Sequence, residues 1–91
     1  MFFEIYPMEK LKIAVAQFEP KDGDKTYNLS IIEALTQKAN ERGADVISFH
    51  ELSLTAYTFL KDLNREQLLG IAEKIPDGES CHHLIEISKK Y

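Results

Sequence analysis

Residues 45–57, Asp-Val-Ile-Ser-Phe-His-Glu-Leu-Ser-Leu-Thr-Ala-Tyr, are the stretch that decides the fold. Val46, Ile47 and Phe49 form a short apolar run with the β-branched and aromatic side chains that are typical of a buried strand. His50 and Glu51 follow at once, and burying an ionised carboxylate is costly unless it is paired. We therefore expect the strand to leave the core at Glu51. The carboxyl ends of parallel strands are where α/β proteins build their sites, so Glu51 is the candidate for chemistry.

The composition limits the class of protein. The chain has 91 residues, with 44% hydrophobic and 29% charged residues, which predicts one small globular domain at most. The net charge is −4 and the basic residues are dispersed, so nucleic-acid binding is not expected. A single cysteine excludes an intrachain disulfide and fits a reducing compartment. With no membrane-length apolar run and no signal-peptide pattern, we expect a cytoplasmic protein without membrane attachment.

The stretch before residue 45 predicts a strand and a long helix. Residues 11–18 are apolar enough for a first strand, and residues 25–42 have helical periodicity. The apolar positions that recur at spacings of three and four are Leu29, Ile32, Leu35 and Ala39. Asp24 is a suitable N-cap, and Gly43 is a suitable residue just past the C-terminus. Strand, helix and strand at this spacing predict a βαβ unit with parallel strands.

Two more helices are predicted after Tyr57. Residues 64–74 begin with the capping-box pair Asn64 and Gln67. The side chains expected to face inward from this helix are Leu68, Leu69, Ala72 and Ile75. Residues 76–78 predict a turn, and Ser80 is the expected cap of a last helix that reaches residue 90. The residues expected on one face of that helix are Leu84, Ile87 and Tyr91.

The predicted elements do not make a complete sheet. Residues 1–10 are a leader, either a partly ordered terminus or an edge strand that Pro7 would end. Two remaining strands are too few for a stable sheet, and strands that are apolar throughout need cover on both faces. We therefore expect residues 11–91 to be the first part of a larger, incomplete α/β domain. The chain would be a fragment, a truncated reading frame or a polypeptide that depends on a partner.

Several segments together resemble one known family. In order, they are residues 12–18 (KIAVAQF), Asn28-Leu29, residues 43–57, residues 75–80 (IPDGES) and residues 89–91 (KKY). Their order and spacing resemble the N-terminal portion of the nitrilase superfamily, the carbon–nitrogen hydrolases. The resemblance implies an α/β fold, the incomplete N-terminal part of a four-layer α-β-β-α sandwich. It also implies a small-molecule nitrile, amide or carbamoyl substrate, no cofactor, and a homo-oligomer in the complete protein.

The resemblance also implies a mechanism. Glu51 would be the general base that takes a proton from a cysteine thiol, and His50 and Tyr57 would lie near the site. The family's cysteine nucleophile and its oxyanion-stabilising lysine match no residue here, so we expect the 91-residue chain alone to be inactive. Many members have proline where this chain has His50 and glycine where it has Ala56. Ala56 would be strained if its φ were positive.

Other readings of the polar residues are less favoured. Cys81 lies near a predicted helix start beside His82 and His83, but adjacent helical residues do not face each other, so we expect an inert cysteine. The histidines lack zinc-ligand spacing, and a partial calcium-loop pattern has Tyr27 where glycine is needed, so no metal is expected. Asn28 is expected to be structural, tying the first helix to nearby loops.

Two functions outside hydrolysis remain open. A nucleotide-binding unit is one, although residues 19–23 contain no glycine-rich phosphate loop. A catalytically inactive α/β fragment that acts as an interaction or oligomerisation module is the other.

Overall fold

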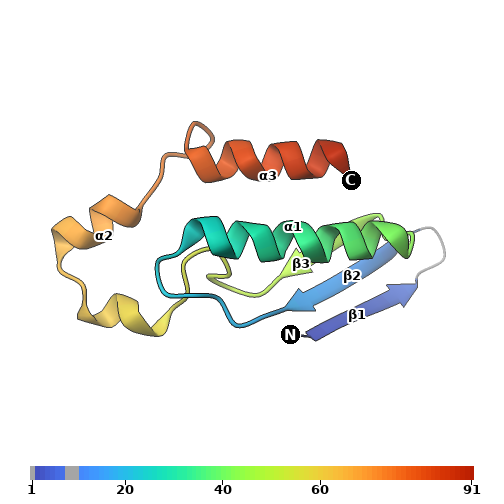
Figure 1. The fold of residues 1–91 in the computed structure, drawn as a ribbon, viewed down its shortest axis with the longest axis horizontal. Helices are drawn as coiled ribbons and strands as arrows, with labels where there is room; N and C mark the ends of the chain where they lie inside the picture. The colour runs from blue at the N-terminus through green and yellow to red at the C-terminus, as the bar shows by residue number, and fades with distance from the viewer. Residues whose placement is uncertain (1, 8–10) are drawn as a thin grey trace.

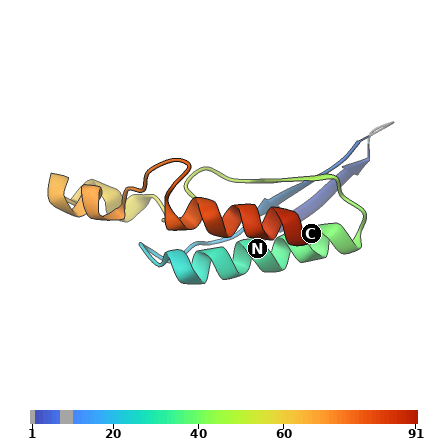
Figure 2. The ribbon, with the colours of Figure 1, turned by 90° about the horizontal axis from the view of Figure 1, so that it is seen from above.

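The structure, a computed structural model, describes residues 2–7 and 11–91. Its elements in chain order are β1 (Phe2–Pro7), β2 (Lys12–Gln17), α1 (Lys25–Glu41), β3 (Val46–Phe49), the 3₁₀ helix η1 (Thr58–Asp62), α2 (Arg65–Ile71) and α3 (Glu79–Lys90) (Figure 1). The molecule measures 46 × 25 × 20 Å. Its long axis is extended because η1 and α2 lie beyond one end of the sheet (Figure 2).

The sheet has three strands in the order β1-β2-β3. Strands β2 and β3 are parallel, with Ile13 opposite Val46, which confirms the predicted pairing. Strand β1 is antiparallel to β2, with Phe3 opposite Ala16. The leader therefore contributes an edge strand, and the expected count of two strands was one too few. Residues 8–10 of the leader lie outside the described part of the chain.

Helix α1 forms as its sequence predicts. The Asp24 side chain caps it by accepting a hydrogen bond from the Tyr27 N–H at 3.0 Å, and Gly43 follows it with φ at 77°. The residues of the predicted stripe, Leu29, Ile32, Leu35 and Ala39, are all buried. They face the sheet at Ala14 and Ala16, whose short side chains allow the helix to approach closely.

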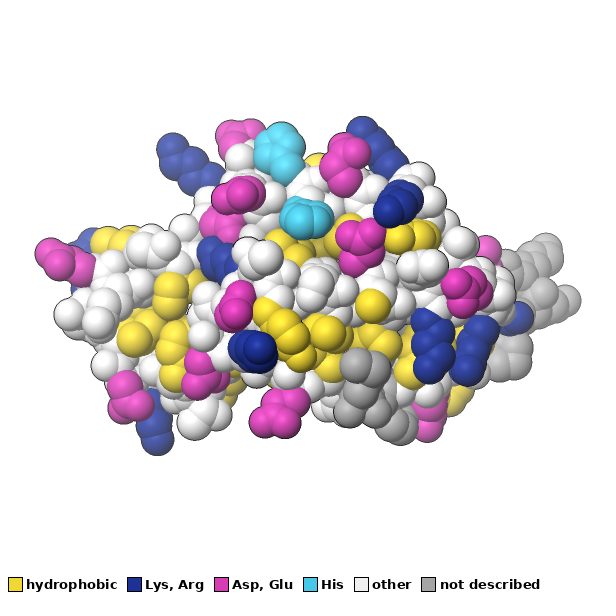
Figure 3. Space-filling model, in the orientation of Figure 1, with side chains coloured by type: hydrophobic (Ala, Val, Ile, Leu, Met, Phe, Trp, Pro, Cys, Tyr) yellow, Lys and Arg dark blue, Asp and Glu magenta, His cyan; other side chains and the backbone are white. Residues whose placement is uncertain are grey.

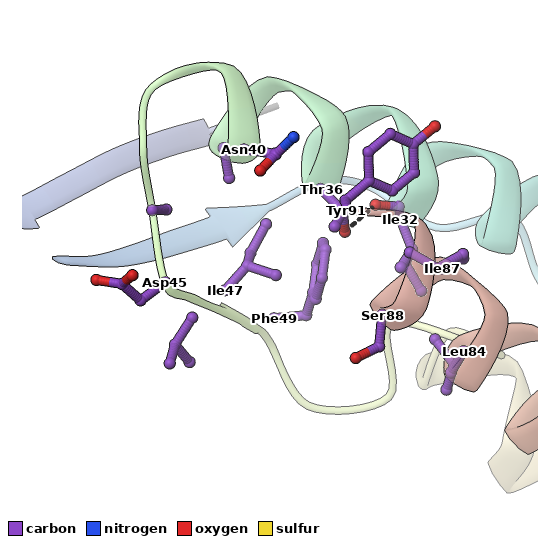
Figure 4. Close-up of a pocket in the computed structure, with 13 residues that line it drawn as sticks. Ile32, Thr36, Asn40, Asp45, Ile47, Phe49, Leu84, Ile87, Ser88 and Tyr91 are labelled. Atoms are coloured by element: carbon purple, nitrogen blue, oxygen red, sulfur yellow. Dashed lines mark hydrogen bonds between the residues drawn. The ribbon is translucent and has the colours of Figure 1, made fainter. Parts of the chain in front are cut away.

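Helices α1 and α3 lie side by side on the same face of the sheet (Figures 1 and 2). Ile87 anchors α3, since it is 5% exposed and joins the core cluster of Ala16, Phe18, Ile32 and Leu35. At the end of α3, the Tyr91 hydroxyl donates to Glu33 of α1 at 3.0 Å. A cavity of about 380 Å³ lies between the two helices and β3 (Figure 4).

The other face of the sheet is open among the described residues. Val15 of β2 is 37% exposed and Val46 of β3 is 47% exposed, because no described helix or strand packs on that face. Within the described residues, one of the two faces is therefore covered and the other is open, as expected of an incomplete α/β domain. Small apolar side chains on an open sheet face are characteristic of a surface that packs against further structure.

Helix α2 departs most from prediction. It ends at Ile71 rather than Lys74, and none of its residues is buried. Leu68, Leu69 and Ile75, which were expected to face inward, are 42%, 61% and 80% exposed. These side chains are exposed because α2 lies beyond the end of the sheet and does not pack on the core. Apolar side chains are therefore visible on the surface at that end of the molecule (Figure 3). The predicted capping box of Asn64 and Gln67 is present.

Glu73 organises the turn between α2 and α3. Its carboxylate accepts hydrogen bonds from Lys25 Nζ at 2.6 Å, from the Ser80 N–H at 2.7 Å and from the Ser80 hydroxyl at 2.5 Å. Lys25 also donates to the Ile71 carbonyl. The prediction that Ser80 caps α3 is therefore wrong. The cap residue is Gly78, and the Glu73 carboxylate accepts from the Ser80 N–H from outside the helix. The Lys25 ammonium, and then the Ser80 bonds, lower the pKa of Glu73 from 4.5 to about 2.

Candidate active site

Glu51 lies where the sequence predicted, directly after the carboxyl end of β3 and at the start of a turn over residues 51–55. Its side chain is exposed, and within residues 2–7 and 11–91 no hydrogen bond reaches its carboxylate. Strand β2 is parallel, so the loop that follows its own carboxyl end lies at the same edge of the sheet. A carboxylate in this position is free to exchange a proton with a group that approaches the sheet edge.

His50 packs inward beside Glu51. Its Nδ1 lies 3.0 Å from the Glu51 carbonyl oxygen, and because a carbonyl only accepts, Nδ1 carries the proton. The ring packs edge-on against Phe18, with centroids 5.2 Å apart. His50 Nε2 is buried and has no hydrogen-bond partner in the described part of the chain. The imidazole thus fixes the peptide that follows Glu51 and leaves one nitrogen able to accept a hydrogen bond.

The residues after Glu51 adopt strained backbone. Leu52 has φ at 56° and Ala56 has φ at 70°, both in the left-handed region that favours glycine. The Ala56 N–H closes the turn by donating to the Leu52 carbonyl at 2.9 Å. The strain at Ala56 follows the expectation drawn from the family's glycine. The strain at Leu52 had no signal in the sequence, since leucine carries no preference for positive φ.

Asn28 of α1 connects this turn to the loop after β2. It is completely buried, accepts from the Lys21 N–H at 2.8 Å, and donates to the Lys21 carbonyl at 2.9 Å and to the Leu54 carbonyl at 2.8 Å. Beside it, the Gly23 N–H donates to the Thr55 carbonyl at 2.8 Å. The expectation that Asn28 ties the first helix to nearby loops is confirmed.

Tyr57 follows the turn that begins with Glu51 and precedes η1. Its side chain is 69% exposed, and it caps η1 through its backbone without a side-chain hydrogen bond. No hydrogen bond between Tyr57 and Glu51 is present in the part of the chain that the structure describes. A role for Tyr57 near the site stays a prediction.

Cys81 lies on a helix and not at the end of a strand. It is partly buried in the first turn of α3 and lines a mostly apolar cavity of about 370 Å³ together with Leu54 and Leu84. The neighbouring His82 and His83 are exposed.

Among the described residues, no group of three or more His, Cys, Asp or Glu side chains could hold a metal ion. No helix in residues 2–7 and 11–91 is both long and apolar enough to cross a membrane.

The fold and the site define a class of protein: an α/β unit that presents a carboxylate just past the end of one of its two parallel strands. The sequence model of the carbon–nitrogen hydrolase family matches residues 12–91, so the match begins after β1. The chain belongs to the carbon–nitrogen hydrolase family. It is 33% identical over 79 residues to a nitrilase of Pyrococcus abyssi, covering 87% of this chain and 29% of that protein. The chain therefore spans less than a third of the length of that relative.

Proposed function

We propose that this chain is the N-terminal portion of a hydrolase that cleaves a nitrile, amide or carbamoyl carbon–nitrogen bond, with Glu51 as its general base. The observation that carries the proposal is the place of Glu51: its exposed carboxylate follows the carboxyl end of β3, inside the region that the family matches. The substrate class is a small amide or nitrile, and the complete hydrolase acts in the cytoplasm as a homo-oligomer.

In the proposed reaction, the Glu51 carboxylate removes the proton from a cysteine thiol, and the thiolate attacks the carbon of the nitrile or amide. For an amide, the protonated Glu51 then gives that proton to the leaving amine as the carbon–nitrogen bond breaks. Water then loses a proton to Glu51 and attacks the thioester; the carbon–sulfur bond breaks, the acid is released, and Glu51 returns the proton to the thiolate. A lysine stabilises the oxyanion at each tetrahedral stage. His50 Nδ1–H, held on the Glu51 carbonyl, supports the peptide next to the base.

The cysteine and the lysine match no residue of this chain. Cys81 does not match the family's cysteine, because it lies in the first turn of α3 and not at the end of a strand. We therefore propose that the 91-residue chain has no turnover alone. The purified chain should hydrolyse simple amides and nitriles no faster than buffer does, and hydrolysis that depends on Glu51 would contradict this.

A graft tests the proposed function directly. Residues 12–91 should replace the aligned segment of the Pyrococcus abyssi nitrilase and leave a folded protein that hydrolyses members of an amide and nitrile panel. The ungrafted nitrilase is the control, and circular dichroism checks that the graft is folded. A folded graft without hydrolysis of any panel member that the control cleaves would contradict the proposal.

One observation favours a second function, an interaction or oligomerisation module without catalysis. Val15 and Val46 on the open face of the sheet, and Leu69 and Ile75 near α2, expose apolar surface that another polypeptide would bury. Sedimentation equilibrium separates the two. Tight self-association of the isolated chain would favour the module, and a compact monomer would argue against required pairing.

A further inference from the structure

We propose that Asn28 is a positioning residue for Glu51, acting through the turn over residues 51–55; this inference rests on the proposed function. Asn28 never touches the base. It holds the Leu54 carbonyl, at 2.8 Å, in the turn that begins with Glu51.

The first step is the completeness of the Asn28 contacts. The side chain is 0% exposed, and its oxygen and its amide together make three hydrogen bonds, all to backbone groups. Two of them join Asn28 to the backbone N–H and carbonyl of Lys21, in the loop after β2. The third joins it to the Leu54 carbonyl. One amide side chain therefore fixes the distance between the loops that follow the two parallel strands.

The second step is the strain in the turn that Asn28 holds. Leu52 and Ala56 lie on either side of Leu54 and have φ at 56° and 70°. Left-handed backbone at residues other than glycine persists only where the surroundings hold it. Two hydrogen bonds reach this turn from the start of α1 and from the β2 loop: Asn28 donates to the Leu54 carbonyl, and the Gly23 N–H donates to the Thr55 carbonyl at 2.8 Å.

The third step concerns direction. His50 Nδ1–H holds the Glu51 carbonyl at the front of the turn, and Asn28 holds the Leu54 carbonyl three residues on. With both ends held, Glu51 keeps one backbone orientation at the sheet edge. Releasing Leu54 lets the turn relax and move the carboxylate. Displacement of a reacting group by about 1 Å costs up to about a hundredfold in rate.

The test begins with hydrogen exchange on the unmodified 91-residue chain, which needs no activity. The side-chain amide protons of Asn28 should exchange at least about tenfold more slowly than those of Asn40, which is exposed on the same helix. In Asn28→Ala, the Ala56 and Gly23 amides should exchange at least about tenfold faster than in the unmodified chain. Equal rates for Asn28 and Asn40, or an unchanged turn in Asn28→Ala, would overturn the proposal.

Asp24→Ala is the matched control. It removes the α1 cap four residues from Asn28 and destabilises the same helix end, but Asp24 makes no bond to the turn. In the graft on the nitrilase, Asn28→Ala should lower kcat by about tenfold to a hundredfold with KM nearly unchanged, and Asp24→Ala should leave both nearly unchanged. Asn28→Asp keeps the acceptor for the Lys21 N–H and loses the donor to the Lys21 and Leu54 carbonyls, so it should behave like Asn28→Ala in kcat.

The outcomes separate this inference from the proposed function. An active graft whose kcat is equal in Asn28→Ala and Asp24→Ala overturns the positioning role and leaves Glu51 as the base. An inactive but folded graft contradicts the proposed function, and with it the catalytic consequence drawn for Asn28.

Discussion

The Glu73 carboxylate should make the fold sensitive to acid. Its pKa lies at about 2 in the folded chain against an ordinary 4.5, because Lys25 and Ser80 donate to the ionised form. A carboxyl whose pKa is lower in the folded state stabilises that state above the unfolded pKa, and the stabilisation is lost as pH falls. The stability that Glu73 contributes should therefore be full at neutral pH and disappear between about pH 4.5 and about pH 2.

Urea denaturation at a series of pH values measures this. Glu73→Gln should flatten the acid limb of the stability profile and lower stability at pH 7. Glu33→Gln is a useful comparison, since Glu33 also has a lowered pKa, caused first by the Tyr91 hydroxyl and then by Lys90. An acid limb that is as steep in Glu73→Gln as in the unmodified chain would show that the network is not formed.

Gly78 should be intolerant of a side chain. A Cβ there would lie 2.7 Å from the Lys74 carbonyl oxygen and 2.8 Å from Glu73 Cβ, so the turn would have to open. Gly78→Ala should cost about 1–3 kcal/mol of unfolding free energy. Gly70→Ala is the matched control, because nothing lies within 4 Å of its position on α2, and the change should be neutral or stabilising by up to about 1 kcal/mol. Equal urea midpoints for the two variants would contradict this.

At single residues, what could be predicted was what local sequence encodes. Glu51 stood out because a carboxylate follows an apolar run, and Asp24 because a capping residue precedes a helical stripe. The Lys25–Glu73 pair could not be predicted, because its partners are 48 residues apart and are joined only when α2 and α3 are placed. The catalytic role of Glu51 itself came from the family resemblance and stays a prediction.

At the scale of the element, α3 should depend on one side chain. Ile87 is 5% exposed and packs into the α1–sheet core, whereas Ile85 is 44% exposed two residues earlier. Ile87→Ala should destabilise the chain by about 2–5 kcal/mol, since it removes buried contacts and leaves a cavity. Ile85→Ala should change stability by less than about 0.5 kcal/mol. Thermal unfolding followed by circular dichroism compares the two, and similar losses would mean that α3 packs by another face.

Elements were predictable in proportion to the strength of their periodicity. The α1 stripe and the apolar run of β3 are unambiguous, and both elements appear where expected. Helix α2 was predicted with the wrong orientation because its leucines were assigned to a core that it does not reach. Strand β1 was left open, because only its pairing with β2 distinguishes it from an unstructured terminus.

For the whole molecule, the open sheet face is the feature that the sequence predicted only indirectly. Strands with apolar residues on both faces of the sheet indicate that both faces pack against other elements. Helices α1 and α3 cover one of these faces. The chain spans 29% of the length of the nitrilase to which it is similar. Which of the two faces is open could not be predicted, because that depends on where α1 and α3 pack, and local patterns do not encode those long-range contacts.

The central claim is that Glu51 is the general base of a carbon–nitrogen hydrolase. The measurement that tests it most directly is kcat of the folded graft on the nitrilase, with and without Glu51→Gln. We expect a fall of about 10²- to 10⁴-fold, the contribution typical of a positioned general base. Glu86→Gln is the control, because Glu86 is exposed on α3 and pairs with the exposed Lys89 at 3.9 Å; it should leave kcat unchanged. A Glu51→Gln graft that is folded and turns over as fast as the Glu86→Gln graft would contradict the account.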